Sequence, residues 1–387
     1  MKTKIINAKI VLPSSVMDGV LVTDGGVISY VGECYDGEYD SIYDAEGAYL
    51  LPGFIDIHCH GGGGYDFMDA TPEQMLKISD FHLSHGTTTL VPTTMTDTWE
   101  AITGALDKFA SLGEDRGILH GVHLEGPWFS PAQCGAQPTD DMEAPSREKL
   151  SELKAKYPFI ERVSMAPELD EKFDTGRACA ELGMVASVGH TDADFDQTVG
   201  AADNGYTLVT HVYSGMKGVV RVNAYRVAGA VEGALYDDRL TVEVIADGKH
   251  LPSGLLKLIY KCKGADRICL ITDAMRAAGA PDGTESILGK LDGGVAVIVE
   301  DGVAKLPDRL SFAGSVSTSD RLFRTMYSLS GASLPEVARM LSATPARVMG
   351  YTDRGRLEAG LRADLLLLDG ELSVKDVFLG GELVERK

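Results

Sequence analysis

The sequence of 387 residues has no hydrophobic run as long as a membrane span, which needs about 20 apolar residues. Its first residues, Met1 to Lys9, also lack the apolar stretch of a secretory signal peptide. Both absences argue against insertion into a membrane and against secretion. We therefore expect a soluble, cytoplasmic protein that binds no membrane.

The sequence also has no closely spaced cysteine pair and has few basic residues compared with acidic ones. The six cysteines are scattered and form no C-x-x-C pair, so we interpret them as reduced thiols. Only 36 lysines and arginines stand against 57 acidic residues, which gives a formal net charge of −21. A field of this sign repels nucleic acids, so we expect no nucleic-acid partner. If the substrate is an anion, it needs a local basic pocket.

The composition is otherwise that of a globular protein with a sizeable core. Hydrophobic residues make up 44% of the chain and charged residues 24%. A (β/α)8 barrel takes roughly 250 residues, so a chain of this length suggests one large domain with a small companion.

Between residues 52 and 355, short apolar runs alternate with helical patterns, which is typical of parallel βα units. Capping residues predict helix starts at Thr71-Pro72, Ser146 and Asp194. The predicted strands are Gly53–His58, Thr87–Thr94, Ile118–Glu125, Arg162–Ala166, Met184–His190, Thr207–His211, Thr241–Ala246 and Ile268–Thr272.

Two β-rich segments flank this region. Residues 1–51 alternate apolar and polar side chains in short runs separated by turns, and residues 356–387 have the same pattern. Because chain ends often lie close together, we expect both segments to form one small domain beside a barrel of residues 52–355. An insertion, residues 283–310, has the turn signals of β-hairpins.

The strongest local motif ends the first of the eight strands. It reads His58-Cys59-His60, two histidines separated by one residue. Residues i and i+2 of an extended chain point to the same face, so both imidazoles can reach one metal ion. Paired histidines also occur in solvated loops, so this motif alone does not establish a metal site.

Four further candidates end other predicted strands: Glu125, His190, His211 and Asp273. Counted from His60, successive candidates are 65, 65, 21 and 62 residues apart. One βα unit takes about 30 residues or somewhat more, so these steps match two, two, one and two units. The carboxyl ends of barrel strands meet at one mouth, so we predict a metal centre there.

Each candidate also has an ordinary structural interpretation. Glu125 could pair with a lysine at the rim, His211 could lie beneath a loop, and Asp273 could cap a helix. His123 shares the inward face with Glu125, and we expect it to pack inside the barrel or to support a ligand. Three other histidines are interpreted as structural: His82, His85 and His120.

Taken together, the motifs follow the order found in one enzyme family. The ordered set, which covers nearly the whole chain, resembles the N-acetylglucosamine-6-phosphate deacetylases of the amidohydrolase superfamily. The motifs are Pro52-Gly53-Phe54-Ile55-Asp56-x-His58-x-His60, His123-Leu124-Glu125-Gly126-Pro127, Gly189-His190-Thr191-Asp192-Ala193, Thr210-His211, Ile245-Ala246-Asp247-Gly248-x-His250, Thr272-Asp273-Ala274 and Ala313-Gly314-Ser315.

This resemblance implies an α/β fold, a (β/α)8 TIM-like barrel with a small β-sandwich domain built from both chain termini. It implies a metal-dependent hydrolase that converts N-acetylglucosamine 6-phosphate to glucosamine 6-phosphate and acetate in amino-sugar catabolism. It also suggests a homodimer, because the family commonly borrows a phosphate-binding arginine from the neighbouring subunit.

The resemblance further implies six ligands for one or two divalent ions, zinc or iron. In the family, the first ion is bound by one carboxylate and two histidines. The second ion is bound by the histidine pair and an aspartate, and the carboxylate of the first site bridges both ions. In this chain they are Glu125, His190 and His211, then His58, His60 and Asp273.

Amide hydrolysis needs a nucleophile at neutral pH, a polarised carbonyl group and a proton for the departing amine. Zinc lowers the pKa of water to about 7, and Asp273 suits the roles of base and then acid. His250 matches a family histidine that hydrogen-bonds the substrate, and the amide of Gln137 could donate to the acyl oxygen. The other expected substrate contacts are Ala136, Ser214, Gly215, Arg226 and Ser315.

The match to the family fails after His211. The family usually has Asn-Ala-Met there, followed by an Arg-Glu-Pro-Gly segment whose arginine contacts the phosphate; here Ser214-Gly215-Met216 follows, and the second segment is missing. Arg226 is the nearest substitute, although it could equally be solvated. The sequence therefore does not decide whether the substrate carries a 6-phosphate group. The alternative substrates are unphosphorylated N-acetylglucosamine and the galactosamine 6-phosphate epimer.

Two other classes rank lower. A cyclic-amide hydrolase of the dihydroorotase type usually has a carboxylated lysine on the fourth strand, where this chain reads Arg162-Val163-Ser164-Met165-Ala166. A non-catalytic scaffold typically loses several ligands, whereas all six are present here.

Overall fold

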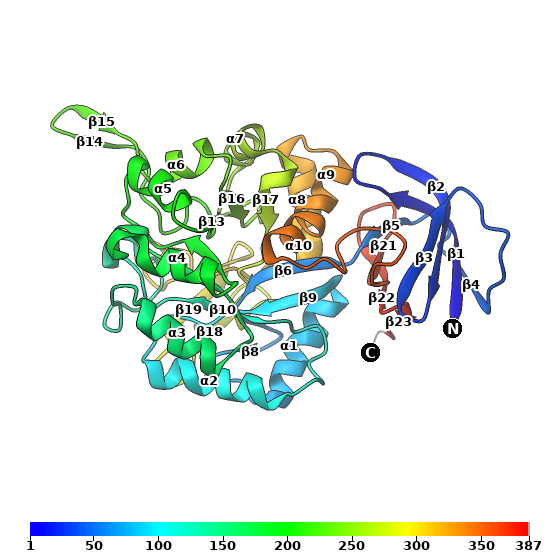
Figure 1. Ribbon diagram of the computed structural model, residues 1–387, viewed down its shortest axis with the longest axis horizontal. Coiled ribbons are helices and arrows are strands. Elements are labelled where there is room, and N and C mark those ends of the chain that lie inside the picture. Colours follow the sequence, from blue (N-terminus) through cyan, green and yellow to red (C-terminus); the bar gives the residue numbers. More distant parts are fainter. Residues whose placement is uncertain (386–387) are drawn as a thin grey trace.

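The computed structural model describes residues 1–385 and confirms the predicted alternation of strands and helices. Figure 1 shows a large α/β part and, beside it, a small β part built from the first strands and the last described strands of the chain. No helix within residues 1–385 combines the length and the apolar character that crossing a membrane requires.

Eight parallel strands form the centre of the large part, and they coincide with the eight predicted ones. Six pair in the order β10-β11-β12-β13-β16-β17, and β6 pairs with β9. Their bounds are β6 Phe54–Cys59, β9 Thr87–Pro92, β10 Val122–Glu125, β11 Ile160–Met165, β12 Val185–Val188, β13 Tyr206–Val209, β16 Thr241–Val244 and β17 Ile268–Leu270.

Hydrogen bonds join the two sheets at both edges. The amide of Thr94 donates to His123 O at 3.0 Å, beside β9 and β10. At the other edge, the amide of Asp273 donates to His58 O at 3.0 Å, and that of His60 to Ala274 O at 2.8 Å. The eight strands therefore follow one another around a ring in chain order, which is how their carboxyl ends come to share one mouth.

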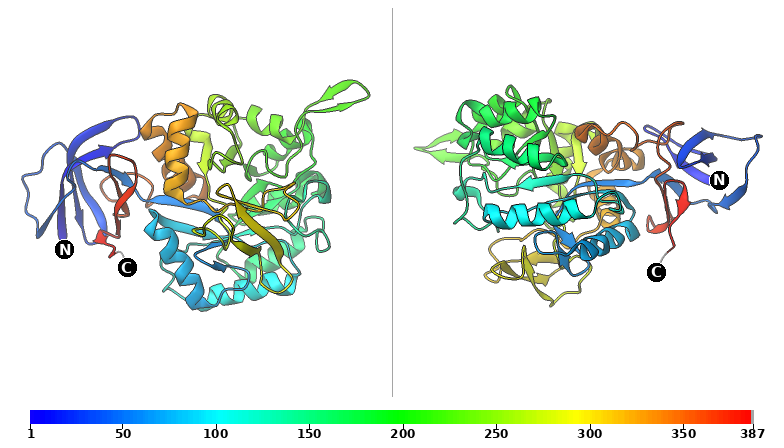
Figure 2. Two further views of the ribbon diagram at one scale, coloured as in Figure 1. Left: turned by 180° about the vertical axis from the view of Figure 1, so that it is seen from behind. Right: turned by 60° about the horizontal axis from the view of Figure 1, so that its bottom comes forward.

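Helices lie outside the strands (Figures 1 and 2), and the three predicted caps are confirmed. Helix α1 (Pro72–Ser84) has Thr71 as its N-cap, α3 (Arg147–Lys156) has Ser146, and α5 (Phe195–Ala202) has Asp194; each cap side chain accepts a backbone hydrogen bond. The other α-helices are α2 Trp99–Ser111, α4 Asp174–Glu181, α6 Ala230–Tyr236, α7 Ser253–Lys263, α8 Ser319–Ser330, α9 Leu334–Met340 and α10 Ala343–Met349.

The chain ends meet in one sheet of order β23-β22-β21-β5-β1-β2-β3, with β4 on β1. The expected association of the two termini is thereby confirmed, whereas a two-sheet sandwich and the domain boundaries stay predictions. The bounds are β1 Lys2–Val11, β2 Val16–Asp24, β3 Val27–Gly32, β4 Ser41–Asp44, β5 Tyr49–Pro52, β21 Leu365–Leu368, β22 Val374–Leu379 and β23 Glu382–Leu383.

The predicted hairpins in the insertion are confirmed as β18 (Glu285–Leu288), β19 (Val295–Glu300) and β20 (Val303–Lys305), drawn in olive in Figure 2. A second hairpin, β14 (Val220–Val222) with β15 (Tyr225–Val227), was not predicted and projects from the large part (Figure 1). Two short strands, β7 (Gly61–Gly62) and β8 (Tyr65–Asp66), follow β6.

Candidate metal centre

The six predicted ligands lie at or just beyond the carboxyl ends of five strands: β6, β10, β12, β13 and β17. Three of them have a left-handed backbone: His190 (φ 44°), His211 (φ 27°) and Asp273 (φ 46°). Side chains with a Cβ rarely adopt this conformation, and it is concentrated at functional sites, where the surrounding structure enforces it.

Glu125 lies in the middle of the cluster. Its Oε1 atom is 2.9 Å from His211 Nε2, 3.4 Å from His190 Nε2 and 3.5 Å from His58 Nε2. Its Oε2 atom is 3.1 Å from His60 Nε2. Glu125 thus reaches all four imidazoles, as the bridging position requires.

The histidine pair of β6 and Asp273 complete the cluster. His58 Nε2 and His60 Nε2 are 3.3 Å apart, and Asp273 Oδ1 is 3.4 Å from the first and 3.3 Å from the second. Two ligands bound to one tetrahedral zinc at about 2.05 Å lie about 3.3 Å apart. The spacing of these atoms therefore fits a shared cation.

The charges of the site also call for a cation. Burial lowers the pKa of His58, but Glu125 and Asp273 outweigh this effect and raise it to about 9. Burial raises the pKa of Glu125, yet the surrounding histidines hold it well below its ordinary range. Carboxylates this deeply buried need positive charge beside them, and a divalent ion supplies it. The residues present therefore fit the predicted metal.

A cavity of about 280 Å³ lies over this cluster, and His60, Glu125, His190, His211 and Asp273 form part of its lining. Ligand pockets begin at roughly 300 Å³, so the cavity suits a ligand of about one sugar unit. The expected substrate contacts Ala136, Gln137, Ser214, Gly215 and His250 also line it. The other lining residues were not predicted as substrate contacts, although Gly314 belongs to a family motif; they are Met95, Gly135, Tyr213, Leu288, Ser311, Phe312 and Gly314.

Two expected substrate contacts lie elsewhere in this chain. Ser315 is fully buried, does not line the cavity and donates its hydroxyl hydrogen to Thr272 O. Its role as a direct substrate contact stays a prediction. Arg226 is exposed on the projecting hairpin, where its guanidinium donates to Ala224 O. Within residues 1–385, the lining of this cavity includes no lysine or arginine.

Gln137 and His250 are both held in place by hydrogen bonds. The side-chain amide of Gln137 donates to Glu125 Oε2 at 2.8 Å and accepts from Thr96 N at 2.9 Å. One of its donor hydrogens is therefore already bonded to Glu125. His250 Nδ1 lies 2.8 Å from Asp247 Oδ2, and its ring centre is 4.7 Å from that of Phe312. The contact with Asp247 leaves His250 Nε2 free for a ligand.

The remaining histidines have structural contacts. His123 lies beneath the cluster, where its Nε2 atom is 2.7 Å from Ser164 Oγ and its ring packs 4.7 Å from that of His58. His85 is 3.2 Å from Asp320, and His120 is 3.3 Å from Glu161. These positions agree with the supporting or structural roles expected for them.

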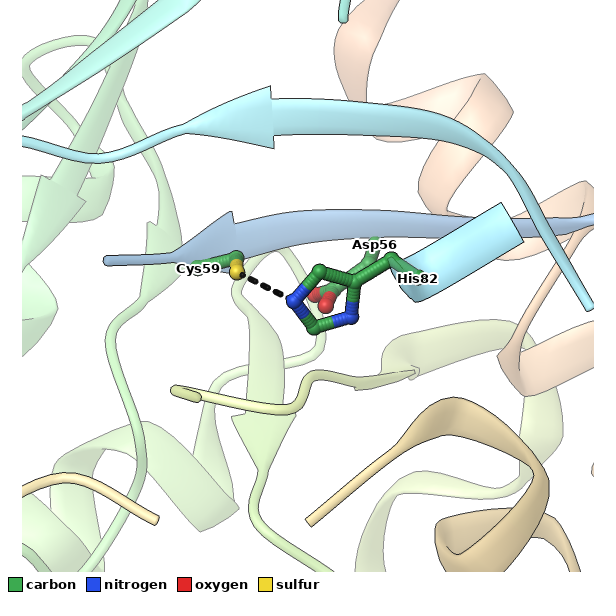
Figure 3. A group of neighbouring side chains, drawn as sticks. All are labelled: Asp56, Cys59 and His82. Atoms are coloured by element: carbon green, nitrogen blue, oxygen red, sulfur yellow. Dashed lines mark hydrogen bonds between the residues drawn. The ribbon is translucent and has the colours of Figure 1, made fainter. Parts of the chain in front are cut away.

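A third group of possible ligands is buried between β6, which carries Asp56 and Cys59, and α1, which carries His82 (Figure 3). Cys59 Sγ is 3.2 Å from His82 Nε2, and both atoms also contact Gly61 O. The carboxylate of Asp56 accepts from the hydroxyl of Thr272 at 2.5 Å and from the amide of His58 at 3.2 Å. Hydrogen bonds thus engage Cys59 Sγ, His82 Nε2 and the carboxylate of Asp56, so we interpret the group as structural support for β6.

Comparison with known proteins gives the family. A family model described as the amidohydrolase family matches residues 49–384. The chain belongs to the amidohydrolase family. The predicted resemblance within that family is also confirmed, because an N-acetylglucosamine-6-phosphate deacetylase of Lysinibacillus sphaericus is 32% identical over 94% of this chain and 92% of its own.

Other relatives and solved structures agree with this membership. An N-acetylgalactosamine-6-phosphate deacetylase of Escherichia coli is 33% identical over 89% of both chains. The structure of a mutant N-acetyl-D-glucosamine-6-phosphate deacetylase from Mycobacterium smegmatis, in complex with N-acetyl-D-glucosamine-6-phosphate, superposes with a TM-score of 0.90. It is 32% identical and covers 99% of this chain and 98% of that one.

Proposed function

We propose that this amidohydrolase removes the acetyl group of N-acetylglucosamine 6-phosphate and releases glucosamine 6-phosphate and acetate. The observation that supports this most directly is the set of six ligands spaced for a cation beneath a sugar-sized cavity. Relatives about a third identical over most of their length support the choice of substrate class.

One or two divalent ions, zinc or iron, would be held in two groups that share the Glu125 bridge: Glu125, His190 and His211, and His58, His60 and Asp273. A bound ion of this kind supplies Lewis acidity, which brings the pKa of water near 7 and polarises a carbonyl group.

Asp273 is the proposed base and acid of the reaction. It lines the cavity, and although burial raises its pKa, the neighbouring histidines His58 and His60 hold it below the ordinary value, so the group is ionised at neutral pH. It can therefore accept a proton from the attacking water and return it to the sugar nitrogen as the amide bond breaks.

The cavity walls would orient the sugar. We assign His250 to a hydrogen bond with the substrate, because Asp247 holds its ring and leaves Nε2 free. Ala136, Ser214 and Gly215 line the same cavity and would contact the sugar or its phosphate. Gln137 would act partly through Glu125, which it already contacts.

The 6-phosphate would be bound by an arginine from a second subunit. The cavity lining includes no lysine or arginine within the described residues, and the net charge of −21 opposes an anion. Arg226 sits on a hairpin that projects from its own subunit, beside the exposed side chains of Val222 and Tyr225, which are 50% and 78% exposed. We therefore propose a homodimer in which this hairpin reaches the partner's cavity.

Two finer points of the proposal follow the family. We propose that the ring of eight strands is a closed (β/α)8 barrel and that residues 1–51 and 356–387 form a β-sandwich. We also propose a cytoplasmic location, which the free state of all six cysteines supports.

The galactosamine epimer is the second candidate substrate, because its deacetylase is as similar to this chain as those specific for glucosamine. A deacetylation assay that compares N-acetylglucosamine 6-phosphate, its galactosamine epimer and unphosphorylated N-acetylglucosamine decides among them. The highest kcat/KM for the first compound supports the proposal. Equal values with and without the phosphate would refute the phosphate part of it.

A further inference from the structure

A buried ion pair lies inside the barrel, and the proposed chemistry makes no use of it. Arg162 on β11 and Glu243 on β16 are both fully buried, and the guanidinium of Arg162 donates to Glu243 Oε1. Arg162 also donates to Ile57 O at 3.0 Å, on the strand of the histidine pair. Two full charges in a barrel core are costly to desolvate, and a hydrophobic pair would often be as stable. Their presence therefore needs a reason other than stability.

The second carboxylate oxygen of Glu243 contacts a predicted metal ligand, which gives the ion pair a role beyond stability. Glu243 Oε2 is 3.2 Å from His58 Nδ1, on the side of the ring that faces away from the cluster. When Nδ1–H donates to this carboxylate, the tautomer of His58 is set and the lone pair of Nε2 faces Glu125 and Asp273. Oε2 also accepts from the backbone amide of His211 at 3.3 Å, but it does not touch that imidazole.

The other three histidines of the centre lack such a carboxylate. His190 Nδ1 lies 2.9 Å from a backbone oxygen, that of Gln133. The Nδ1 atoms of His60 and His211 are buried and have no hydrogen-bond partner within residues 1–385. A hydrogen bond to a carboxylate makes an imidazole a stronger ligand than one to a carbonyl group, so the pair acts on one ligand selectively.

We propose that Glu243, held in place by Arg162, is a positioning residue that sets the affinity of the ion bound by His58 and His60. The affinity of the ion bound by Glu125, His190 and His211 is then largely independent of it. This inference rests on the metal centre of the proposed function.

The test measures zinc affinity at both positions by competition with a chelator, on the full-length protein and without substrate. Because removal of one charge leaves the other unpaired in the core, the variants are double: Arg162→Met with Glu243→Leu, and Arg162→Met with Glu243→Gln. The amide of the second variant keeps an acceptor for His58 Nδ1–H. Glu161→Gln is the matched control, because Glu161 neighbours Arg162 in the chain yet contacts Tyr351 and His120 and not the cluster.

The wild-type protein and the control are expected to bind two zinc ions with unchanged affinities. The leucine variant should bind one of them about 10- to 100-fold more weakly, and the glutamine variant should lose less. Thermal unfolding measured on the same samples separates loss of an ion from loss of the fold.

Three results would overturn the inference: wild-type affinity at both positions in the leucine variant, an equal loss at both positions, or a wild-type protein that binds a single ion. The readout uses zinc alone. If the proposed deacetylation is wrong, the protein shows no turnover, but the leucine variant still loses zinc affinity at one position only. The two failures are therefore distinguishable.

Discussion

Replacement of Asp273 by asparagine removes one charge from the cluster and leaves its shape unchanged. Asp273 Oδ1 lies 3.4 Å from His58 Nε2 and 3.3 Å from His60 Nε2, and the residue also lines the cavity, so a single change removes both a ligand and the proposed base. Loss of a positioned base alone costs about 10²- to 10⁴-fold in rate. Because the ligand is lost as well, we expect a decrease in kcat of at least about 10³-fold, or about 4 kcal/mol.

The assay for Asp273→Asn follows acetate release from N-acetylglucosamine 6-phosphate at saturating substrate. Metal content is measured on the same sample, and the ion at Glu125, His190 and His211 should be retained. An unchanged kcat, or a defect confined to KM, would refute the role given to Asp273, since a group that only binds substrate changes KM.

Three further predictions concern phosphate, metal and acid. Arg226→Met should raise KM for the 6-phosphate sugar about 10-fold or more, because a charge-assisted contact with phosphate is lost. Turnover of unphosphorylated N-acetylglucosamine should be unchanged. An equal effect on both sugars would contradict a phosphate contact. Removal of metal by a chelator should abolish turnover, and it should lower the unfolding temperature because a ligand that binds only the folded state stabilises it. Added zinc should restore turnover and the unfolding temperature. An unchanged unfolding temperature after metal removal would contradict a buried metal centre. Burial raises the pKa of Asp320, but His85, Thr318 and Arg324 more than offset this and hold it well below its ordinary value. The stability that Asp320 contributes should therefore be fully present above about pH 4 and decrease progressively as the pH falls below it. The difference in urea unfolding between wild type and Asp320→Asn should then be largest at pH 7 and become smaller between about pH 4 and pH 2. A difference that stays constant over this range would refute this.

The sequence was most informative where burial and chemistry coincide in one short segment. Most of the eight strands are rich in apolar residues, and the metal ligands lie at the ends of these strands, as His58 and Glu125 do, or within a few residues beyond them, as His190 does. Helix starts were predictable because Thr71, Ser146 and Asp194 satisfy backbone amides that no earlier turn can reach.

Features that depend on tertiary contacts could not be predicted in the same way. Hairpin β14–β15 buries little, so its short strands lack the alternation that marks a half-buried strand. The pairing of Arg162 with Glu243 joins residues 81 positions apart, and only the ring of strands brings them together. Ser315 belongs to a family motif, but its hydroxyl donates to a backbone oxygen instead of pointing into the cavity.

The most direct test of the metal centre is a crystal structure of the protein supplied with zinc, with anomalous scattering recorded at the zinc absorption edge. The account predicts one peak within bonding distance of Glu125, His190 and His211, and a second beside His58 and His60. Fully zinc-supplied crystals without a peak in contact with Glu125 would contradict it.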